Sequence, residues 1–314
     1  MKLATFVRST GEAAVGVVDT ARGTILDLAK ASEKVHGRAE AAFGSMLALI
    51  EGGDEALGKV RAVASQKLVV AEQPLPRTRL LSPLPVPPSI RDCLVFEQHL
   101  VNAMKQWEKM TGRPSVPISP TWYERPSWYK GNRFSFVGHE AEVTWPFYSE
   151  LMDFELELAC VIGRRGKDLT AANALDHVFG FTIFNDFSAR DLQVHERPLG
   201  MGPMKSKDFD TGNVLGPWIV TSDEIGDPHA LDMEVRVNGE RWGGGNSSGM
   251  HHKFGDILAF MTRSETLHPG EVIASGTVPT GCGLELGRFL KPNDVVELEI
   301  EKIGILRNRI VRPR

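Results

Sequence analysis

Two glutamates stand two residues apart inside an apolar stretch of this 314-residue chain. The stretch, DFELELACVIG, begins at Asp153 and carries Glu155 and Glu157. Side chains alternate between the two faces of a β-strand, so these two carboxylates would share one face. Carboxylates are costly to bury without a positive charge, and hard, oxygen-preferring ions such as Mg²⁺ or Ca²⁺ meet that need. A half-exposed edge strand with its glutamates on the wet face would give the same pattern.

A second set of polar residues, Asp186, Arg190 and Gln193, follows the apolar run GFTIFN. We expect a helix to open at Asp186, which would place the three side chains on one helical face. A carboxylate, a guanidinium and an amide together suit a metal ion and an anionic, oxygen-rich substrate. Helix capping is the simpler account of Asp186 taken alone.

Two more candidates lie beside turns rich in glycine. Lys207 precedes a strand-like run, and a lysine near a metal can hold an enolate or carboxylate oxygen; a solvated loop lysine is the ordinary case. Thr277, in IASGTVPTGCG, lies in a turn that could offer N–H groups and a hydroxyl to an anion. A plain turn at the end of a strand is the competing interpretation of Thr277.

The elements that must position these residues are mostly short strands. Strands are expected in residues 1–30, and from residue 129 onwards turn signals alternate with short apolar runs. Apolar residues at helical spacing predict an amphipathic helix from Phe96 to Met110. Residues 111–128 show no period and suggest a loop that is either disordered or functional, for example a lid. Further helices are expected in residues 31–65, 170–178, 187–195 and 252–263. This pattern predicts a β-rich α+β fold.

Prolines crowd the stretch PLPRTRLLSPLPVPPS, which is stiff and extended and unsuited to interior helix or strand. We therefore predict a small N-terminal domain at residues 1–75, a proline-rich linker at 76–89 and a catalytic domain at 90–314.

Composition excludes several classes of function. The net charge of −4 gives no electrostatic case for binding nucleic acid. No apolar run is long enough to predict a membrane span, and the first residues lack the apolar core of a signal peptide. Three cysteines, Cys93, Cys160 and Cys282, are an odd number at unrelated spacings, which disfavours a disulfide framework or a structural zinc cluster. We expect a cytoplasmic protein.

The motif order of the chain resembles that of the fumarylacetoacetate hydrolase family over residues 90–314. The segments that carry the resemblance are RDCLVFEQH, YKGNRFSFVG, DFELELACVIG, NDFSARDLQ, SKDFDTGNVLGPWIV and EVIASGTVPTGCGLELG. The N-terminal segment resembles, less specifically, the small leading domain of bacterial members. The resemblance implies a β-sandwich roll preceded by a small α/β domain.

The resemblance also implies a role for each matched residue. It implies one Mg²⁺, or Mn²⁺ or Ca²⁺ in its place, held by Asp92, Glu155, Glu157 and Asp186. His99 would be the water-activating histidine and Glu285 its acidic partner, whereas His99 alone would suggest a partly buried helix histidine. The remaining matches are Arg190, Gln193 and Lys207, which stabilise an oxyanion, and Tyr129 and Thr277, which contact the substrate.

Two matches are missing or ambiguous. The family's arginine for the substrate carboxylate has no clear counterpart, with Arg113 and Lys109 as the candidates in residues 105–128. His251 and His252 would either line the pocket or face solvent.

The function implied is Mg²⁺-dependent hydrolysis of a C–C bond in a β-diketo acid, such as fumarylacetoacetate, fumarylpyruvate or another acylpyruvate. Water would be activated by His99 and Glu285, and the enolate held by the metal and Lys207. The alternative is a decarboxylase, isomerase or hydratase of a 2-oxo dicarboxylate from the catabolism of aromatic compounds. A non-enzymatic binding protein is disfavoured because every acidic ligand position is filled. The expected partners are a small oxo or diketo acid and a second copy of the chain in a homodimer.

Overall fold

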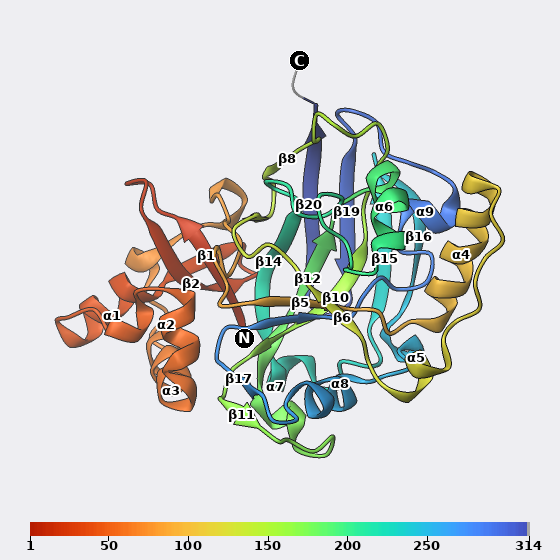
Figure 1. Cartoon of the computed structure of the whole chain (residues 1–314). Coiled ribbons are helices and arrows are strands. Elements are labelled where there is room, and N and C mark those ends of the chain that lie inside the picture. The colour runs from red at the N-terminus through yellow and green to blue at the C-terminus, as the bar shows by residue number, and fades with distance from the viewer. Residues whose placement is uncertain (313–314) are drawn as a thin grey trace.

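The computed structural model describes residues 1–312 and builds them around one large mixed sheet (Figure 1). The sheet has 11 strands in the order β4-β3-β2-β1-β14-β12-β10-β18-β5-β6, with β7 paired to β14. Its strands are β1 Lys2–Val7, β2 Ala13–Asp19, β3 Thr24–Asp27, β4 Glu72–Pro74, β5 Ile90–Cys93, β6 Trp128–Lys130, β7 Phe136–Val137, β10 Leu156–Ile162, β12 Val178–Asp186, β14 Asn213–Thr221 and β18 Val272–Ala274.

A second sheet of five strands packs against one face of the large sheet. Its order is β16-β15-β19-β20-β8, with bounds β8 Glu142–Thr144, β15 Asp232–Val237, β16 Glu240–Asn246, β19 Val295–Ile300 and β20 Gly304–Val311. Two short pairs complete the β-structure: β9 Met152–Asp153 with β13 Ser188–Ala189, and β11 Gly166–Lys167 with β17 Thr266–Leu267.

Strand β10 lies at the centre of the fold and is buried on both faces. Leu156 and Leu158 point into the core between the two sheets, where they join Leu298 of β19. Ala159 and Val161 point the other way, into a second core shared with the N-terminal elements. Burial on both faces explains why the sequence of this strand is a nearly continuous apolar run.

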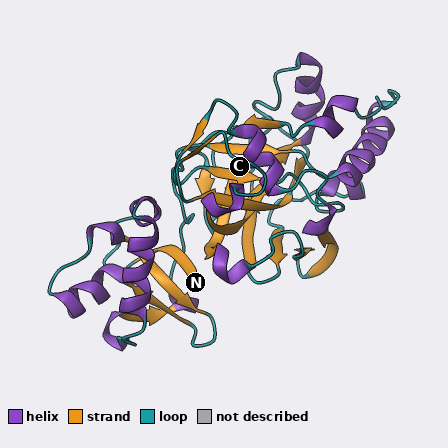
Figure 2. Ribbon diagram, turned by 90° about the horizontal axis from the view of Figure 1, so that it is seen from below, coloured by secondary structure: helices purple, strands orange, loops and turns teal. Residues whose placement is uncertain are grey.

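The N-terminal segment forms a lobe beside the main body (Figure 2). Its strands β1 to β4 form an antiparallel meander covered by helices α1 Leu28–His36, α2 Met46–Glu51 and α3 Gly53–Ala64. Strand β1 also pairs with β14, with Leu3 opposite Ile219, so the meander continues the large sheet. Residues 78–89 form no helix or strand beyond one bridge between Phe6 and Leu80. The division into two domains and a linker stays a prediction.

The helices predicted around residues 96–110 and 252–263 are present, but residues 170–178 form only a short 3-10 helix, Ala174–His177, before β12 begins at Val178. The helix predicted from Phe96 is α4 Glu97–Thr111, and α8 Phe254–Met261 matches its predicted range. The irregular 111–128 stretch contains a short helix, α5 Pro120–Glu124, which Ser119 caps. The remaining helices are α6 Arg190–Glu196, α7 Ser222–Ile225 and α9 Gly283–Leu286.

The prediction that Asp186 opens a helix is wrong. Asp186 is the last residue of β12, because the ladder with β14 continues as far as the pair Asp186–Asn213. The helix begins four residues later, at Arg190, after the short strand β13. Asp186, Arg190 and Gln193 therefore do not share one helical face.

The β-rich α+β architecture is confirmed. Within residues 1–312, no helix combines the length and the apolar character that crossing a bilayer requires.

Candidate active site

The sheet order brings three strand ends to one place. Strand β10 runs antiparallel to β12, so the start of β10 lies beside the end of β12, where Glu157 and Asp186 are found. Strand β18 runs antiparallel to β10 and parallel to β5, and it places Asp92 near the end of β5 at the same edge. Residues far apart in the chain thus meet because of strand direction.

Four carboxylates gather at this edge of the sheet. Each of Asp92, Glu155, Glu157 and Asp186 offers an oxygen within 4.8 Å of the others, and all four residues are buried. The predicted alternation of Glu155 and Glu157 onto one face is therefore observed. Oδ1 of Asp92 and Oδ1 of Asp186 are buried but have no hydrogen-bond partner in the part of the chain that the structure describes. Buried oxygens without partners are unusual and need a physical explanation.

Two buried cations partly compensate the carboxylates. The ammonium of Lys207 contacts Glu155 and lies 2.5 Å from Oδ2 of Asp186. The guanidinium of Arg190 donates to Glu155 Oε1 and to Asp153 Oδ2, at 2.7 Å each. The carboxylates outnumber the cations, so a net negative charge stays in the cluster.

The pKa shifts of the four carboxyl groups show which of them lack a compensating positive charge. Burial, and then the neighbouring carboxylates, raise the pKa of Asp92 and of Glu157 well above their ordinary values. Burial also raises the pKa of Asp186. Burial would do the same for Glu155, but Arg190 and Lys207 outweigh it and lower the pKa of that carboxyl. The two uncompensated carboxyls, Asp92 and Glu157, therefore favour either a proton or a metal ion.

The donor set fits a hard divalent cation. Oxygen ligands only, a cluster of converging carboxylates and unpartnered buried oxygens are what Mg²⁺, Mn²⁺ or Ca²⁺ requires. The assignment of the four residues as ligands stays a prediction.

The predicted pair of His99 and Glu285 is brought together. Nδ1 of His99, on α4, lies 2.7 Å from Oε1 of Glu285, on α9. Oε2 of Glu285 accepts from Asn102 Nδ2 at 2.7 Å and from the backbone N–H of Thr280 at 3.0 Å. Helices α4 and α9 pack through an apolar cluster that includes Ala103 and Leu284. The carboxylate is thus held rigidly and can orient the imidazole.

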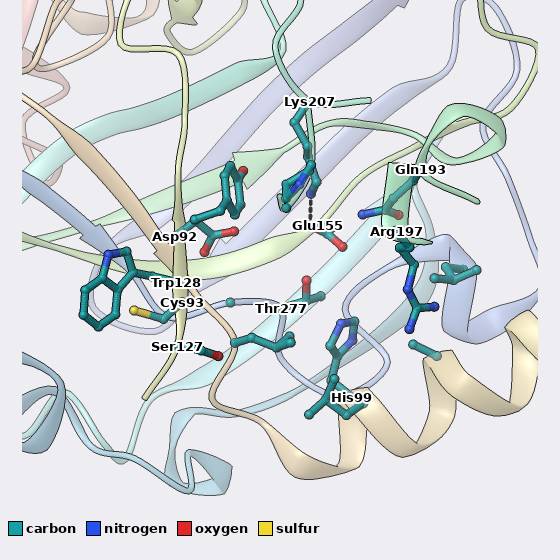
Figure 3. A pocket seen from close by; sticks show the side chains of 18 of the residues that line it. Asp92, Cys93, His99, Ser127, Trp128, Glu155, Gln193, Arg197, Lys207 and Thr277 are labelled. Carbon is teal, nitrogen blue, oxygen red and sulfur yellow. Dashed lines mark hydrogen bonds and ion pairs between the residues drawn. The ribbon is translucent and has the colours of Figure 1, made fainter. Parts of the chain in front are cut away.

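A cavity of about 320 Å³ connects the histidine to the carboxylates. Figure 3 shows His99 rising from α4 on one side, with Glu155 and Lys207 on the other. The predicted residues that line it are Asp92, His99, Tyr129, Glu155, Glu157, Arg190, Gln193, Lys207 and Thr277. Asp186 and Glu285 lie behind this lining, and each contacts a residue in it.

The two predicted substrate contacts also support the carboxylates. The hydroxyl of Tyr129 donates to Asp186 Oδ2 at 2.5 Å. The backbone N–H of Gly276 donates to Glu157 Oε2 at 3.0 Å, and Thr277 Oγ1 lies 3.5 Å from the other oxygen of Glu157. Both side chains line the cavity, and the hydroxyl group of each already contacts a carboxylate of the cluster.

Three residues of the site were missed by sequence reasoning. Asp153 is fully buried, binds Arg190 and accepts from two N–H groups of α9. Its spacing of two from Glu155 could have revealed it, since alternation puts it on the same face. Asn102 lies one helical turn after His99, which is also a visible signal. The third, Arg197, carries no such signal.

Arg197 lines the same cavity and packs over Trp107, with 5.6 Å between the guanidinium carbon and the ring centroid. Its side chain is exposed to solvent and forms no ion pair within the described residues. We call the cavity of about 320 Å³ the reaction cavity. Of the two candidates that the sequence offers for binding the substrate carboxylate, Arg113 lines a neighbouring cavity, and Lys109 does not line the reaction cavity.

The two adjacent histidines outside the site hold α5 in place. Nε2 of His252 lies 2.8 Å from the carbonyl oxygen of Trp122, and Nε2 of His251 lies 3.2 Å from that of Tyr123. Neither histidine lines the reaction cavity.

Comparisons with known proteins place this geometry in a family. Residues 91–311 match the family model described as fumarylacetoacetate (FAA) hydrolase C-terminal. The human protein named oxaloacetate tautomerase FAHD2A, mitochondrial, is 35% identical over 269 residues, which cover 85% of this chain and 80% of the human protein.

Solved structures agree on the fold. A fumarylacetoacetate hydrolase from Exiguobacterium antarcticum superposes with a TM-score of 0.76 at 29% identity, covering both chains completely. A maleylpyruvate hydrolase from Sphingobium sp. SYK-6, solved with manganese (II) and pyruvate, gives 0.75 at 24% identity, also with complete coverage, and supports the fold alone.

Proposed function

The chain belongs to the fumarylacetoacetate hydrolase family, and from that premise we propose that it is a divalent-metal-dependent hydrolase of a C–C bond in a β-diketo acid. The observation that carries the proposal is that the His99–Glu285 pair and the carboxylate cluster face one cavity. A base opposite a metal-binding cluster suits the attack of water on a polarised carbonyl.

The proposed ligands are Asp92, Glu155, Glu157 and Asp186, holding Mg²⁺ or, in its place, Mn²⁺ or Ca²⁺. When bound, the ion supplies Lewis-acid polarisation of the substrate's 2-oxo acid group. The converging carboxylates with unpartnered buried oxygens support this choice of ion.

His99 acts as the general base in this proposal. Its Nδ1–H donates to Glu285, which leaves Nε2 to take a proton from a water molecule in the cavity. The water oxygen bonds to the distal carbonyl carbon, and the bond between that carbon and the methylene carbon breaks. The electron pair passes into the enolate of the 2-oxo acid, and the proton held by His99 returns to the methylene carbon.

Lys207, Arg190 and Gln193 stabilise the negative charge that develops on oxygen. Gln193 accepts from Arg190 through Oε1 at 2.9 Å, so its amide N–H₂ is oriented to donate to the substrate. Lys207 supplies a fixed positive charge beside Glu155 and Asp186. Arg197, which lines the cavity and has no acidic partner among residues 1–312, binds the substrate carboxylate. Tyr129 and Thr277, which line the cavity, contact the substrate.

A second candidate is oxaloacetate tautomerase, an isomerase of a 2-oxo dicarboxylate. The 35% identity to the human protein of that name over 85% of this chain favours it. Tautomerisation moves a proton between carbon and oxygen and cleaves no C–C bond, so His99 would serve without a water molecule. Decarboxylation and hydration of related oxo acids use the same kind of enolate and stay as further variants.

A substrate panel with Mg²⁺ and with Mn²⁺ separates these reactions. We expect pyruvate release from acetylpyruvate and its loss in EDTA. Turnover that persists in EDTA would contradict the metal proposal. Rapid decay of enol-oxaloacetate without cleavage of any acylpyruvate would establish the tautomerase instead.

A further inference from the structure

A second cavity, of about 600 Å³, adjoins the reaction cavity and is not used by the proposed chemistry. The two cavities share five lining residues, Leu94, Leu100, Met104, Ser127 and Trp128. We call this second cavity the side chamber. Since the lining is shared, a molecule at the carboxylate cluster can extend into the side chamber.

Strand register fixes the distance between the chamber and the carboxylates. Strands β5 and β6 pair Asp92 with Tyr129 and then Cys93 with Trp128. The next residue pair, Leu94 and Ser127, continues the ladder with a hydrogen bond of 3.2 Å and forms a wall of the chamber. Leu94 is two residues from Asp92, or about 7 Å along the strand. That length matches the few carbon atoms between the 2-oxo acid end of an acylpyruvate and its acyl substituent.

The lining of the side chamber is mostly apolar. Its walls include Leu94, Leu100, Met104, Ile118, Trp122, Pro126, Trp128 and Phe260. Among the described residues that line it there is no Asp, Glu, Lys or His, and the one charged side chain is the solvent-exposed Arg125. Such a chamber offers little to a second carboxylate and much to a hydrocarbon.

The walls are held in place before any ligand enters. The indole N–H of Trp122, on α5, donates to the carbonyl of Leu94 at 2.6 Å, which satisfies its polar group and leaves its ring apolar. Trp128 packs edge-on against Phe260 of α8, with ring centroids 6.0 Å apart. The histidine contacts of α5 described above fasten the same wall. A preformed apolar cavity loses little entropy on binding.

We propose that the side chamber is a subsite for the acyl substituent of the substrate, and that the preferred substrates are acylpyruvates with an extended apolar acyl chain. This inference rests on the proposed function and narrows its substrate class. The reactive end lies at the carboxylate cluster, and the chain passes Leu100 and Met104 to lie between Trp122, Ile118 and Phe260.

The test compares kcat/KM for acetylpyruvate, hexanoylpyruvate and fumarylpyruvate with Mg²⁺. We expect hexanoylpyruvate to exceed acetylpyruvate by at least about tenfold, because added methylenes leave water. Fumarylpyruvate, which ends in a carboxylate, should show no such gain. A flat or falling series in the wild-type protein would overturn the subsite.

Ile118→Trp fills the chamber at a residue that does not line the reaction cavity. The variant should lose the gain for hexanoylpyruvate and keep acetylpyruvate turnover within about twofold. Ile118→Asp, which places a charge there, should give the same pattern if the tryptophan variant fails to fold. The matched control is Val116→Trp in the same segment, whose side chain is exposed and does not line the chamber. If Ile118→Trp lowers kcat/KM equally for acetylpyruvate and for hexanoylpyruvate, the proposal is contradicted.

A binding measurement separates this inference from the proposed reaction. N-methyloxamate and N-hexyloxamate carry the 2-oxo acid oxygens but no distal carbonyl for water to attack. Calorimetry with Mg²⁺ should show the hexyl compound binding at least about tenfold more tightly. If this gain appears and no acylpyruvate is cleaved, the hydrolase proposal fails and the subsite stands. If acetylpyruvate is cleaved and neither measurement depends on chain length, the subsite fails alone.

Discussion

At the scale of residues, the proposed site has two halves: carboxylates that would bind a metal ion and a histidine that would move protons. His99 is buried on α4 and its Nδ1 is bonded to Glu285, so only its other nitrogen is available to the cavity. The carboxylates lie across the same cavity. Removing either half should therefore have different consequences for metal binding and for turnover.

The first prediction concerns His99→Ala. Loss of the base should lower kcat for acylpyruvate cleavage by about 10²- to 10⁴-fold. Affinity for Mg²⁺, measured by calorimetry, should stay unchanged because the four carboxylates are intact. Lys105→Ala, on the exposed side of the same helix, serves as the control and should leave kcat unaltered. Turnover that survives the loss of His99 would favour an enolate reaction without water activation.

The second prediction concerns Arg197, the cavity cation with no acidic partner within the described residues. Arg197→Ala should raise KM for acetylpyruvate by about tenfold or more, since a charge-assisted contact with a carboxylate is lost. Arg113→Ala, in the neighbouring cavity, should leave KM within about twofold. The reverse ranking would return the carboxylate-binding role to Arg113.

The third prediction follows from the raised pKa of Asp92 and of Glu157. Without metal, the folded protein binds these protons more tightly than the unfolded chain, so the contribution of these two groups to stability is fully present at low pH and falls as pH rises past the ordinary carboxyl values. A metal ion competes with those protons. The increase in Tm on adding Mg²⁺ should therefore be larger near about pH 8 than near about pH 5.

Glu157→Gln tests the same charge balance directly. The change removes one like charge from the cluster, so the metal-free variant should be more stable than wild type near about pH 8, by about 1 kcal/mol or more. Its Mg²⁺-dependent rise in Tm should be lost. Glu55→Gln, at a glutamate whose side chain is 80% exposed, should change neither quantity. A Glu157→Gln protein that keeps the full response to Mg²⁺ would remove Glu157 from the proposed ligand set.

At the scale of elements, local patterns could predict some placements and not others. The shared face of Glu155 and Glu157 follows from alternation within one strand, and His99 follows from the period of one helix. The element at Asp186 was misassigned because a strand's length depends on its partner, and β14 extends the ladder to that residue. Arg197 faces the cavity because Trp107 of another helix lies beneath it. Such contacts have no local signature.

The fourth prediction concerns the turn after β18, where Gly276 approaches β5. Gly276 has φ +82, and a Cβ there would lie 2.3 Å from the carbonyl oxygen of Cys93. Gly276→Ala should therefore cost about 2 kcal/mol or more in unfolding free energy and displace the N–H that binds Glu157. Gly239→Ala is the matched control, because its φ is +79 and nothing lies within 4 Å of the added carbon. Equal losses at the two positions would show that backbone strain alone, and not contact with β5, is responsible.

At the scale of the whole molecule, the N-terminal lobe and the site share one sheet. The face of β10 that carries Ala159 and Val161 packs into the same apolar cluster as Phe43 and Leu49 of the lobe. The carboxylate cluster lies at the start of β10, where the chain enters this strand. The lobe therefore covers, further along the strand, the same face of β10 that carries Glu157, so that lobe and site should unfold together.

The last prediction tests that coupling through Phe43, which is 1% exposed in the lobe. All six tryptophans lie at or after residue 107, so tryptophan fluorescence reports unfolding of the larger part of the chain alone. Phe43→Ala removes a large buried ring and should cost about 3–5 kcal/mol. If the lobe and the large sheet unfold as one unit, the unfolding free energy measured by tryptophan fluorescence falls by that amount, and the transition moves to lower denaturant concentration. Val70→Ala, at a side chain that is 72% exposed, should leave it in place. If Phe43→Ala leaves the tryptophan transition unchanged and the helical circular dichroism is lost in a separate step, residues 1–75 are an independent domain.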